Sequence, residues 1–213
     1  MKEKLKVLNG STLKIFAMAV MLVDHMGMVL FPELIWMRII GRLAFPIFAF
    51  FIAEGFYYTK NPLKYMVRMA VFAVVSEPFF DLACSGGIDW GYQNVMLTYL
   101  AAIVGLYILK KTNTVAGCVG MLAAGFVAEL INTDYGCFGV LLVYIYYILR
   151  NTEFTKHLAA SAYIVLGYGG LESYAAISSL PLLFYNGKKG MNLKYLFYAF
   201  YPVHLFILYL ISK

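Results

Sequence analysis

The stretch LKIFAMAVMLVDHMGMVLF, residues 13–31, is apolar throughout except for Lys14, Asp24 and His25. A helix needs about 20 such residues to cross the hydrocarbon core of a bilayer. The stretch is long for the apolar part of a signal peptide, carries two ionisable residues in its second half, and has no small-x-small cleavage site. We therefore expect a retained transmembrane helix.

The composition of the whole chain extends this expectation to the other segments. Of its 213 residues, 62% are hydrophobic and only 13% are charged, whereas soluble proteins contain about 25% charged residues. So few charges do not cover the surface of a water-soluble fold. The apolar segments are continuous rather than alternating, as in YLAAIVGLYIL (99–109), which favours membrane helices. The sequence predicts an all-α, polytopic transmembrane helix bundle that forms one domain over residues 1–213 and crosses the cell (plasma or inner) membrane several times.

Charged residues, polar runs and Gly/Pro clusters divide the chain into about nine apolar segments. The first three are long enough to span a bilayer. The seventh and eighth are short, and we expect them to tilt, to span half of the membrane or to pack inside the bundle. The expected helices are 13–31, 34–57, 65–83, 94–109, 115–131, 136–149, 157–167, 172–185 and 194–211.

The distribution of positive charge predicts the orientation. If the N-terminus is cytoplasmic and the segments alternate, 14 of the 17 Lys and Arg residues fall on the cytoplasmic side, as the positive-inside rule requires. Membrane orientation and anionic lipid then explain the net charge of +6, and we expect no nucleic-acid partner. The cytoplasmic residues are Lys2, Lys4, Lys6, Lys14, Lys60, Lys64, Arg68, Lys110, Lys111, Arg150, Lys156, Lys188, Lys189 and Lys194.

Several polar side chains lie inside the predicted spans. A charged residue there costs about 2.5–3.5 kcal/mol unless it is paired or hydrated, so such residues are candidates for function. The predicted topology places His204 near the middle of the membrane and Glu54 near the inner end of its helix. The others share a similar depth in the outer half: they are Asp24, His25, Arg38, Arg42, Glu77, Asp81, Asn94 and Glu129.

Two interpretations of this cluster stay open. Arg38 and Arg42 lie four residues apart on one helical face, and they either neutralise nearby carboxylates to lock the bundle or bind a ligand. His25 favours function, because an imidazole titrates near neutral pH and suits general-base work. His204 also fits a structural hydrogen bond between helices.

We expect no metal site. The cysteines are odd in number and lack the spacing of metal ligands, so packing as small apolar side chains is the simpler interpretation. They are Cys84, Cys118 and Cys137.

Five stretches carry these residues: LKIFAMAVMLVDHMG (13–27), RIIGRLAFPIFAFFIAEGF (38–56), SEPFFDL (76–82), NVMLT (94–98) and YPVHL (201–205). In order and spacing they resemble the TraX family, and the likeness covers most of the chain. TraX proteins are similar to the transmembrane acyltransferase superfamily that includes the acyltransferase 3 proteins, and the prototype acetylates the amino terminus of a conjugative pilin. The resemblance implies a membrane acyltransferase that moves an acetyl group from acetyl-CoA to an amine or hydroxyl of a peptide or glycan acceptor.

The resemblance also assigns roles to residues. His25 matches the candidate catalytic histidine of the superfamily, and Arg38 and Arg42 resemble arginines that engage the acyl donor. A base of this kind needs an orienting partner, which we expect to be Asp24 or, because adjacent helical residues point about 100° apart, one of two carboxylates on the third segment. These are Glu77 and Asp81. The candidates for substrate binding are Asn94, Glu129, His204 and Glu54.

Two other classes of function compete with this interpretation. Intramembrane His, Arg and carboxylate side chains also suit a small proton-coupled transporter, although such proteins often contain inverted repeats, which we do not find. A non-catalytic assembly protein would need a large apolar patch or a soluble extension for its partners, and the short loops predicted here offer little room for either.

Overall fold

The regular secondary structure of the described residues is entirely helical. The computed structural model covers residues 6–213 apart from the side chain of Lys194, and it contains no strand within that range. The prediction of an all-α fold is therefore confirmed. The helices are α1 (Gly10–Val29), α2 (Ile35–Gly41), α3 (Ala44–Tyr58), α4 (Pro62–Ser85), α5 (Val95–Lys111), α6 (Thr114–Leu130), α7 (Gly136–Ile148), α8 (Thr155–Gly167), the 3-10 helix η2 (Gly170–Ser178), α9 (Ser179–Leu183) and α10 (Lys194–Ile211).

Two predicted segments are divided in the structure. The segment 34–57 breaks between α2 and α3, because Pro46 has no N–H group to bond the carbonyl of Arg42. The N–H of Leu43 instead donates to the carbonyl of Ile40 at 3.3 Å. The segment 172–185 forms η2 followed by the five-residue α9. The first break matters for function, since it places Arg42 at the junction of α2 and α3, which we call the corner.

Asparagines begin four of the long helices. Each accepts a hydrogen bond from a backbone N–H of the first turn, which would otherwise have no partner. Each of these caps stabilises its helix by about 1 kcal/mol. The caps are Asn9 for α1, Asn61 for α4, Asn94 for α5 and Asn113 for α6.

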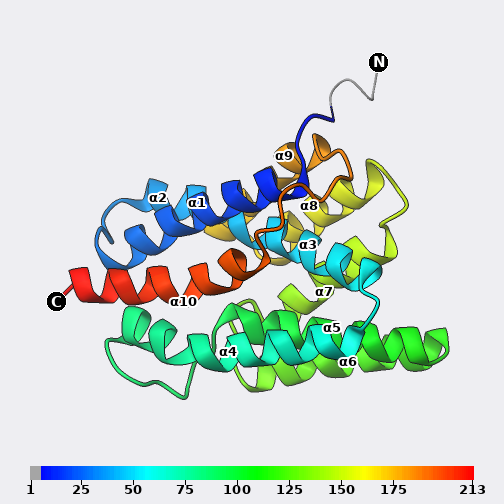
Figure 1. The fold of residues 1–213 in the computed structure, drawn as a ribbon, viewed down its shortest axis with the longest axis horizontal. Coiled ribbons are helices and arrows are strands. Elements are labelled where there is room, and N and C mark those ends of the chain that lie inside the picture. Colours follow the sequence, from blue (N-terminus) through cyan, green and yellow to red (C-terminus); the bar gives the residue numbers. More distant parts are fainter. Residues whose placement is uncertain (1–5) are drawn as a thin grey trace.

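The long helices lie along one axis, so the loops gather at two ends of the bundle (Figure 1). At the end that we call the amino end, the chain before α1 contacts the segment before α10, where the N–H of Gly10 donates to the carbonyl of Lys188 at 2.7 Å. At the carboxyl end, where the chain also terminates, the N–H of Gln93 donates to the carbonyl of Asn132 at 3.0 Å.

The loops at the two ends differ in charge. The basic loops predicted to share one side all lie at the amino end of the bundle, as far as residues 6–213 show (Figure 1). Lys2 and Lys4 lie outside the described residues. The loops of the carboxyl end carry acidic residues instead, and these are Glu33, Asp89, Asp134 and Glu172.

The outer faces of the bundle are apolar. Within the described residues, two stretches are long and apolar enough to cross a membrane: α1, and the residues Ile35–Tyr58 that α2 and α3 form together. On α4 the exposed residues Val67, Val71, Val74 and Val75 follow helical spacing. Soluble monomers rarely expose apolar patches of this extent, so the surface indicates association with a membrane.

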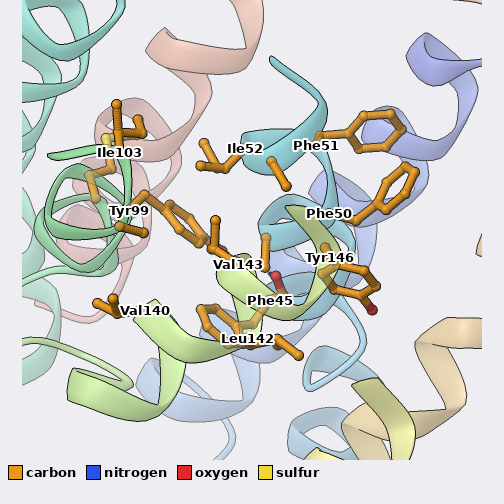
Figure 2. Packing of buried hydrophobic residues seen from close by; sticks show 14 of the residues in the cluster. Phe45, Phe50, Phe51, Ile52, Tyr99, Ile103, Val140, Leu142, Val143 and Tyr146 are labelled. Atoms are coloured by element: carbon orange, nitrogen blue, oxygen red, sulfur yellow. Dashed lines mark hydrogen bonds between the residues drawn. The ribbon is translucent and has the colours of Figure 1, made fainter. Parts of the chain in front are cut away.

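The core lies where α3, α5 and α7 meet (Figure 2). Phe50 of α3 contacts Tyr146 of α7 edge to face at 5.5 Å between ring centroids. Phe45 stacks on Tyr135 at 3.6 Å, and its carbonyl accepts a hydrogen bond from the hydroxyl of Tyr99 at 3.1 Å. This packing fixes α3, which continues from the corner that holds Arg42.

Small residues bring α5 and α6 together, and two of them are Gly117 and Gly120. A Cβ atom on Gly117 would lie 2.8 Å from the Cα of Leu109, and one on Gly120 would lie 2.6 Å from Cγ2 of Ile108. Such distances are below van der Waals contact, so only glycine permits this approach.

We predict that Gly117→Ala lowers the free energy of unfolding by about 1–3 kcal/mol, because the added methyl group pushes against the backbone of α5. Thermal unfolding in detergent micelles measures the effect. Gly87→Ala is the matched control, since a Cβ there meets no atom within 4 Å. Equal stability of both variants would contradict the close approach of the two helices.

Candidate functional site

A buried carboxylate joins α1 to the corner between α2 and α3. Both oxygens of Asp24 accept hydrogen bonds from Nη2 of Arg42 at 2.7 Å. Arg38 donates through Nη1 to Oδ2 of Asp24 at 2.8 Å and to its backbone carbonyl at 3.1 Å. Asp24 is therefore held by both arginines that the sequence singled out.

The two arginines differ in how many donors they have left. Every nitrogen of the Arg42 guanidinium has a partner: besides Asp24, it donates to Oε1 of Glu172 at 2.6 Å, the hydroxyl of Tyr135 at 3.3 Å and the carbonyl of Arg38 at 3.3 Å. Arg38 uses only Nη1, and its Nε and Nη2 make no hydrogen bond to residues 6–213. Its side chain is 25% exposed, against 9% for Arg42. Arg42 is therefore a structural clamp, and Arg38 is free to bind a ligand.

The absence of a side chain at Gly41 permits this arrangement. A Cβ atom at that position would overlap Cβ, Cγ and Oδ1 of Asp24. At the next contact along α1, a Cβ on Gly27 would lie 2.7 Å from Cβ of Met37. The backbone of α2 therefore passes directly against α1 beside the carboxylate.

A chain of hydrogen bonds leads from α10 to His25. Nδ1 of His204 lies 2.6 Å from the carbonyl oxygen of Phe200, and Nε2 of His204 lies 2.7 Å from Nδ1 of His25. A carbonyl only accepts, so His204 carries its proton on Nδ1 and, when neutral, accepts through Nε2. His25 then donates through Nδ1, and its Nε2 keeps a free lone pair. That nitrogen makes no hydrogen bond to the described residues.

One cavity of about 1320 Å³ contains this site. Along α1 its lining runs from Gly10 to Met28 and includes His25 and Asp24, a distance of about 27 Å at the rise of an α-helix. Arg38 also lines it, whereas His204 lies behind His25 and does not. The cavity exceeds the usual volume of a small-molecule site, and its lining includes residues from both ends of the bundle.

The carboxyl end of the cavity is acidic. Asp134 and Glu172 line it with Glu129, and the hydroxyl of Tyr92 donates to Oδ1 of Asp134 at 2.7 Å. Burial raises the pKa of Asp134 to about 6, and the negative charge of Glu172 adds to this, while the hydrogen bond from Tyr92 and the charge of Arg42 oppose it. This end therefore attracts cationic groups at neutral pH.

Three of the predicted polar residues form a separate cluster between α4 and α5. The side-chain amide of Asn94 donates to Glu77 and, at 2.9 Å, to the carbonyl of Ala73. Oδ2 of Asp81 accepts from the N–H of Asp89 at 3.1 Å. We expected Glu77 or Asp81 to orient His25, but the structure gives that position to His204.

The other candidates lie toward the two ends of the cavity. Glu129 accepts from the N–H of Cys137 at 3.0 Å, near the start of α7, and lines the carboxyl end. Glu54 lines the amino end, on α3. Within residues 6–213 no group of three His, Cys, Asp or Glu side chains is placed to hold a metal ion.

Residues that the sequence did not single out complete the site. The sequence assigned no role in the site to Glu172 or Tyr135. The neighbouring residues in the sequence do not predict either contact, because Glu172 and Tyr135 reach Arg42 only through the packing of α7 and η2 against α3. A weak signal exists for Glu172, which is an acidic residue beside an apolar segment with no basic neighbour in sequence.

Comparisons with known proteins agree with the resemblance. The family described as TraX protein matches residues 9–212. The chain is 30% identical to a protein of Dichelobacter nodosus named probable fimbrial assembly protein FimC, serogroup H1, over 92% of each chain. An uncharacterized protein of Rickettsia prowazekii (strain Madrid E) is 53% identical over 45 residues, which cover 21% of this chain and 18% of that protein. No solved structure matches.

We predict that Arg42→Gln destabilises the protein by about 3–5 kcal/mol, because it leaves Glu172 and part of the Asp24 charge without a cation. Arg38→Gln costs less, since Asp24 keeps its contacts with Arg42. Thermal unfolding of both variants in the same detergent measures the difference. Equal losses would show that Arg42 is not the clamp.

Proposed function

The chain belongs to the TraX family, and we propose that it is a multi-pass membrane acyltransferase that acylates an amine or hydroxyl of a peptide or glycan. The family prototype acetylates a pilin amino terminus, and the relative from Dichelobacter nodosus is named as a probable fimbrial assembly protein. A pilin-like peptide is therefore the acceptor that we favour, with acetyl-CoA as the donor.

The charge of the loops supports an orientation. Basic loops remain in the cytoplasm, so we place the amino end of the bundle there and the carboxyl end outside. The donor then enters from the basic end and the acceptor from the acidic end, where Asp134 and Glu129 line the cavity. A protonated amine is attracted to such an end, loses one proton to water there, and reaches His25 as the neutral amine.

One observation carries the proposal: His25 lines a large cavity, its Nδ1 lies 2.7 Å from Nε2 of His204, and its own Nε2 has no hydrogen-bond partner among the described residues. This is the arrangement that a general base requires, with the ring orientation and tautomer fixed from behind. In acyl transferases of the triad type a carboxylate does this. Here a second imidazole does so, and its own tautomer is fixed by the carbonyl of Phe200.

The proposed reaction proceeds as follows. The acceptor nitrogen or oxygen attacks the thioester carbonyl and passes its proton to Nε2 of His25. The tetrahedral intermediate collapses, the C–S bond breaks, and the thiolate takes the proton from Nε2. Because His204 accepts from Nδ1, it shares the positive charge of His25 between these two steps.

Arg38 is the residue that we assign to the oxyanion. Its Nε and Nη2 have no partner among residues 6–213, and it lines the cavity beside His25. Preorganised donors of this kind stabilise developing negative charge. Asp24 keeps Arg38 in place through Nη1.

A proton-coupled transporter is the alternative, and the length of the cavity favours it. A lining that runs from Gly10 to Met28 along α1 also suits a route across a membrane, and intramembrane histidines suit proton relays. Proteoliposomes without any acyl donor distinguish the two functions. We expect no solute uptake driven by a proton gradient, and uptake that disappears in His25→Ala would favour the transporter.

We predict that His25→Ala lowers acyl transfer by about 100- to 10,000-fold, the usual contribution of a general base, while the variant still folds. Purified protein is incubated with labelled acetyl-CoA and scored for thioester hydrolysis and acceptor labelling. His204→Leu should also lose activity, and His204→Gln should retain more of it, because its side-chain oxygen still accepts from Nδ1 of His25.

His157→Gln is the control, since His157 is also buried but does not line the cavity. Activity that survives in His25→Ala would remove His25 from the mechanism. Equal activity of His204→Leu and His204→Gln would remove the role of the hydrogen bond.

A further inference from the structure

Three cations line the amino end of the cavity: Lys14 of α1, Arg68 of α4, and Lys189 before α10. We call these residues the basic mouth. They come from segments far apart in the sequence, and the fold brings them to the same opening. The segment with Lys189 is fixed to the first turn of α1, where the N–H of Met191 donates to Oγ of Ser11 at 3.0 Å.

None of these cations forms an ion pair within residues 6–213, whose salt bridges involve other residues. The ammonium of Lys14 lies 4.7 Å from the ring centroid of Phe51 and 5.3 Å from that of Phe197. Nζ of Lys189 reaches only the side-chain oxygen of Asn192, at 3.5 Å. The positive charges of Lys14 and Lys189 also repel each other.

Arg68 provides a further unsatisfied group. Its Nε is buried and has no hydrogen-bond partner, while its guanidinium carbon lies 5.8 Å from the ring centroid of Tyr65. Buried polar atoms normally have partners, and each exception needs an explanation. An anionic ligand at the mouth would provide one.

The nearest carboxylate does not neutralise the basic mouth. Glu54 lines the same end of the cavity, but the cations that act on it are Lys156 and Arg150. The mouth therefore keeps a net positive charge beside aromatic rings. This combination suits phosphate groups, which take charge-assisted hydrogen bonds from Lys and Arg.

The distance to His25 limits what can bind. Lys14 and His25 are eleven residues apart on α1, which corresponds to about 16 Å. A ligand with phosphates at the mouth delivers an acyl group to His25 only if a long, narrow arm joins the two parts. A phosphopantetheine chain is such an arm.

We propose that Lys14, Arg68 and Lys189 bind the phosphates of a soluble nucleotide thioester, whose arm extends through the cavity to His25. The assignment rests on the proposed acyltransferase function and adds a donor subsite to it. A phospholipid headgroup offers the same phosphate chemistry and is the competing source.

The test measures binding of coenzyme A, without turnover, to the full chain in nanodiscs of phosphatidylcholine. We expect Lys14→Gln, Arg68→Gln and Lys189→Gln each to weaken binding by roughly tenfold or more, because each removes a charged hydrogen-bond donor. Lys188→Gln is the matched control: Lys188 is adjacent in sequence and exposed, but it does not line the cavity. Unchanged affinity in the three variants would overturn the proposal.

Pantetheine, which has the arm but no phosphates, separates binding from folding. It should bind the wild type and the variants with the same weak affinity. If the variants lose as much affinity for pantetheine as for coenzyme A, the cations act on the fold and the proposal is wrong. If phosphatidylglycerol in the nanodiscs displaces coenzyme A from the wild type, the mouth is a lipid site and the proposal is also wrong.

If the proposed acyltransferase reaction is wrong, the result differs from the one expected if the donor subsite is wrong. Coenzyme A that binds through the basic mouth without any acyl transfer supports the subsite and contradicts the reaction. Acyl transfer with an unchanged KM for acetyl-CoA in the three variants supports the reaction and contradicts the subsite.

Discussion

A carboxylate inside a helical bundle is stable only where cations and hydrogen-bond donors surround it, and Asp24 imposes this condition on the structure. Arg38 and Arg42 satisfy it, and Glu172 balances the second positive charge. The four charges sum to zero. They also come from three parts of the chain, so one neutral cluster fixes α1, the corner after α2, and η2.

The same condition explains why His25 has an unusual partner. Its neighbour in sequence, Asp24, is occupied by arginines, and the carboxylates of α4 bind Asn94 and the backbone of Asp89. The imidazole of His204 is neutral, so it holds the ring of His25 without adding a charge that the bundle would have to balance. Electrostatic neutrality and an oriented base are thus obtained from separate sets of residues, although Asp24 and His25 are adjacent.

Much of the fold follows from the sequence because apolar surroundings permit few backbone conformations. Continuous apolar segments must be helical to satisfy their own backbone groups, and basic loops gather at one end. The site was predictable in part: Asp24, His25, Arg38 and Arg42 share a similar depth. Their partners were not, because depth does not specify which face of a helix meets which neighbour. His25 and His204 are 179 residues apart, and only the packing of α10 against α1 and α4 brings them together.

Gly41 gives this site an unusual genetic sensitivity. The backbone of α2 touches the side chain of Asp24 so closely that no Cβ fits between them. Every missense change of a glycine codon encodes a residue with a Cβ, so no such mutation at Gly41 leaves the contact undisturbed. Among natural variants, that codon should change only silently, while the codons of the exposed valines on α4 should vary freely among apolar residues. Glycine at position 41 is therefore as necessary to the site as its charged residues are.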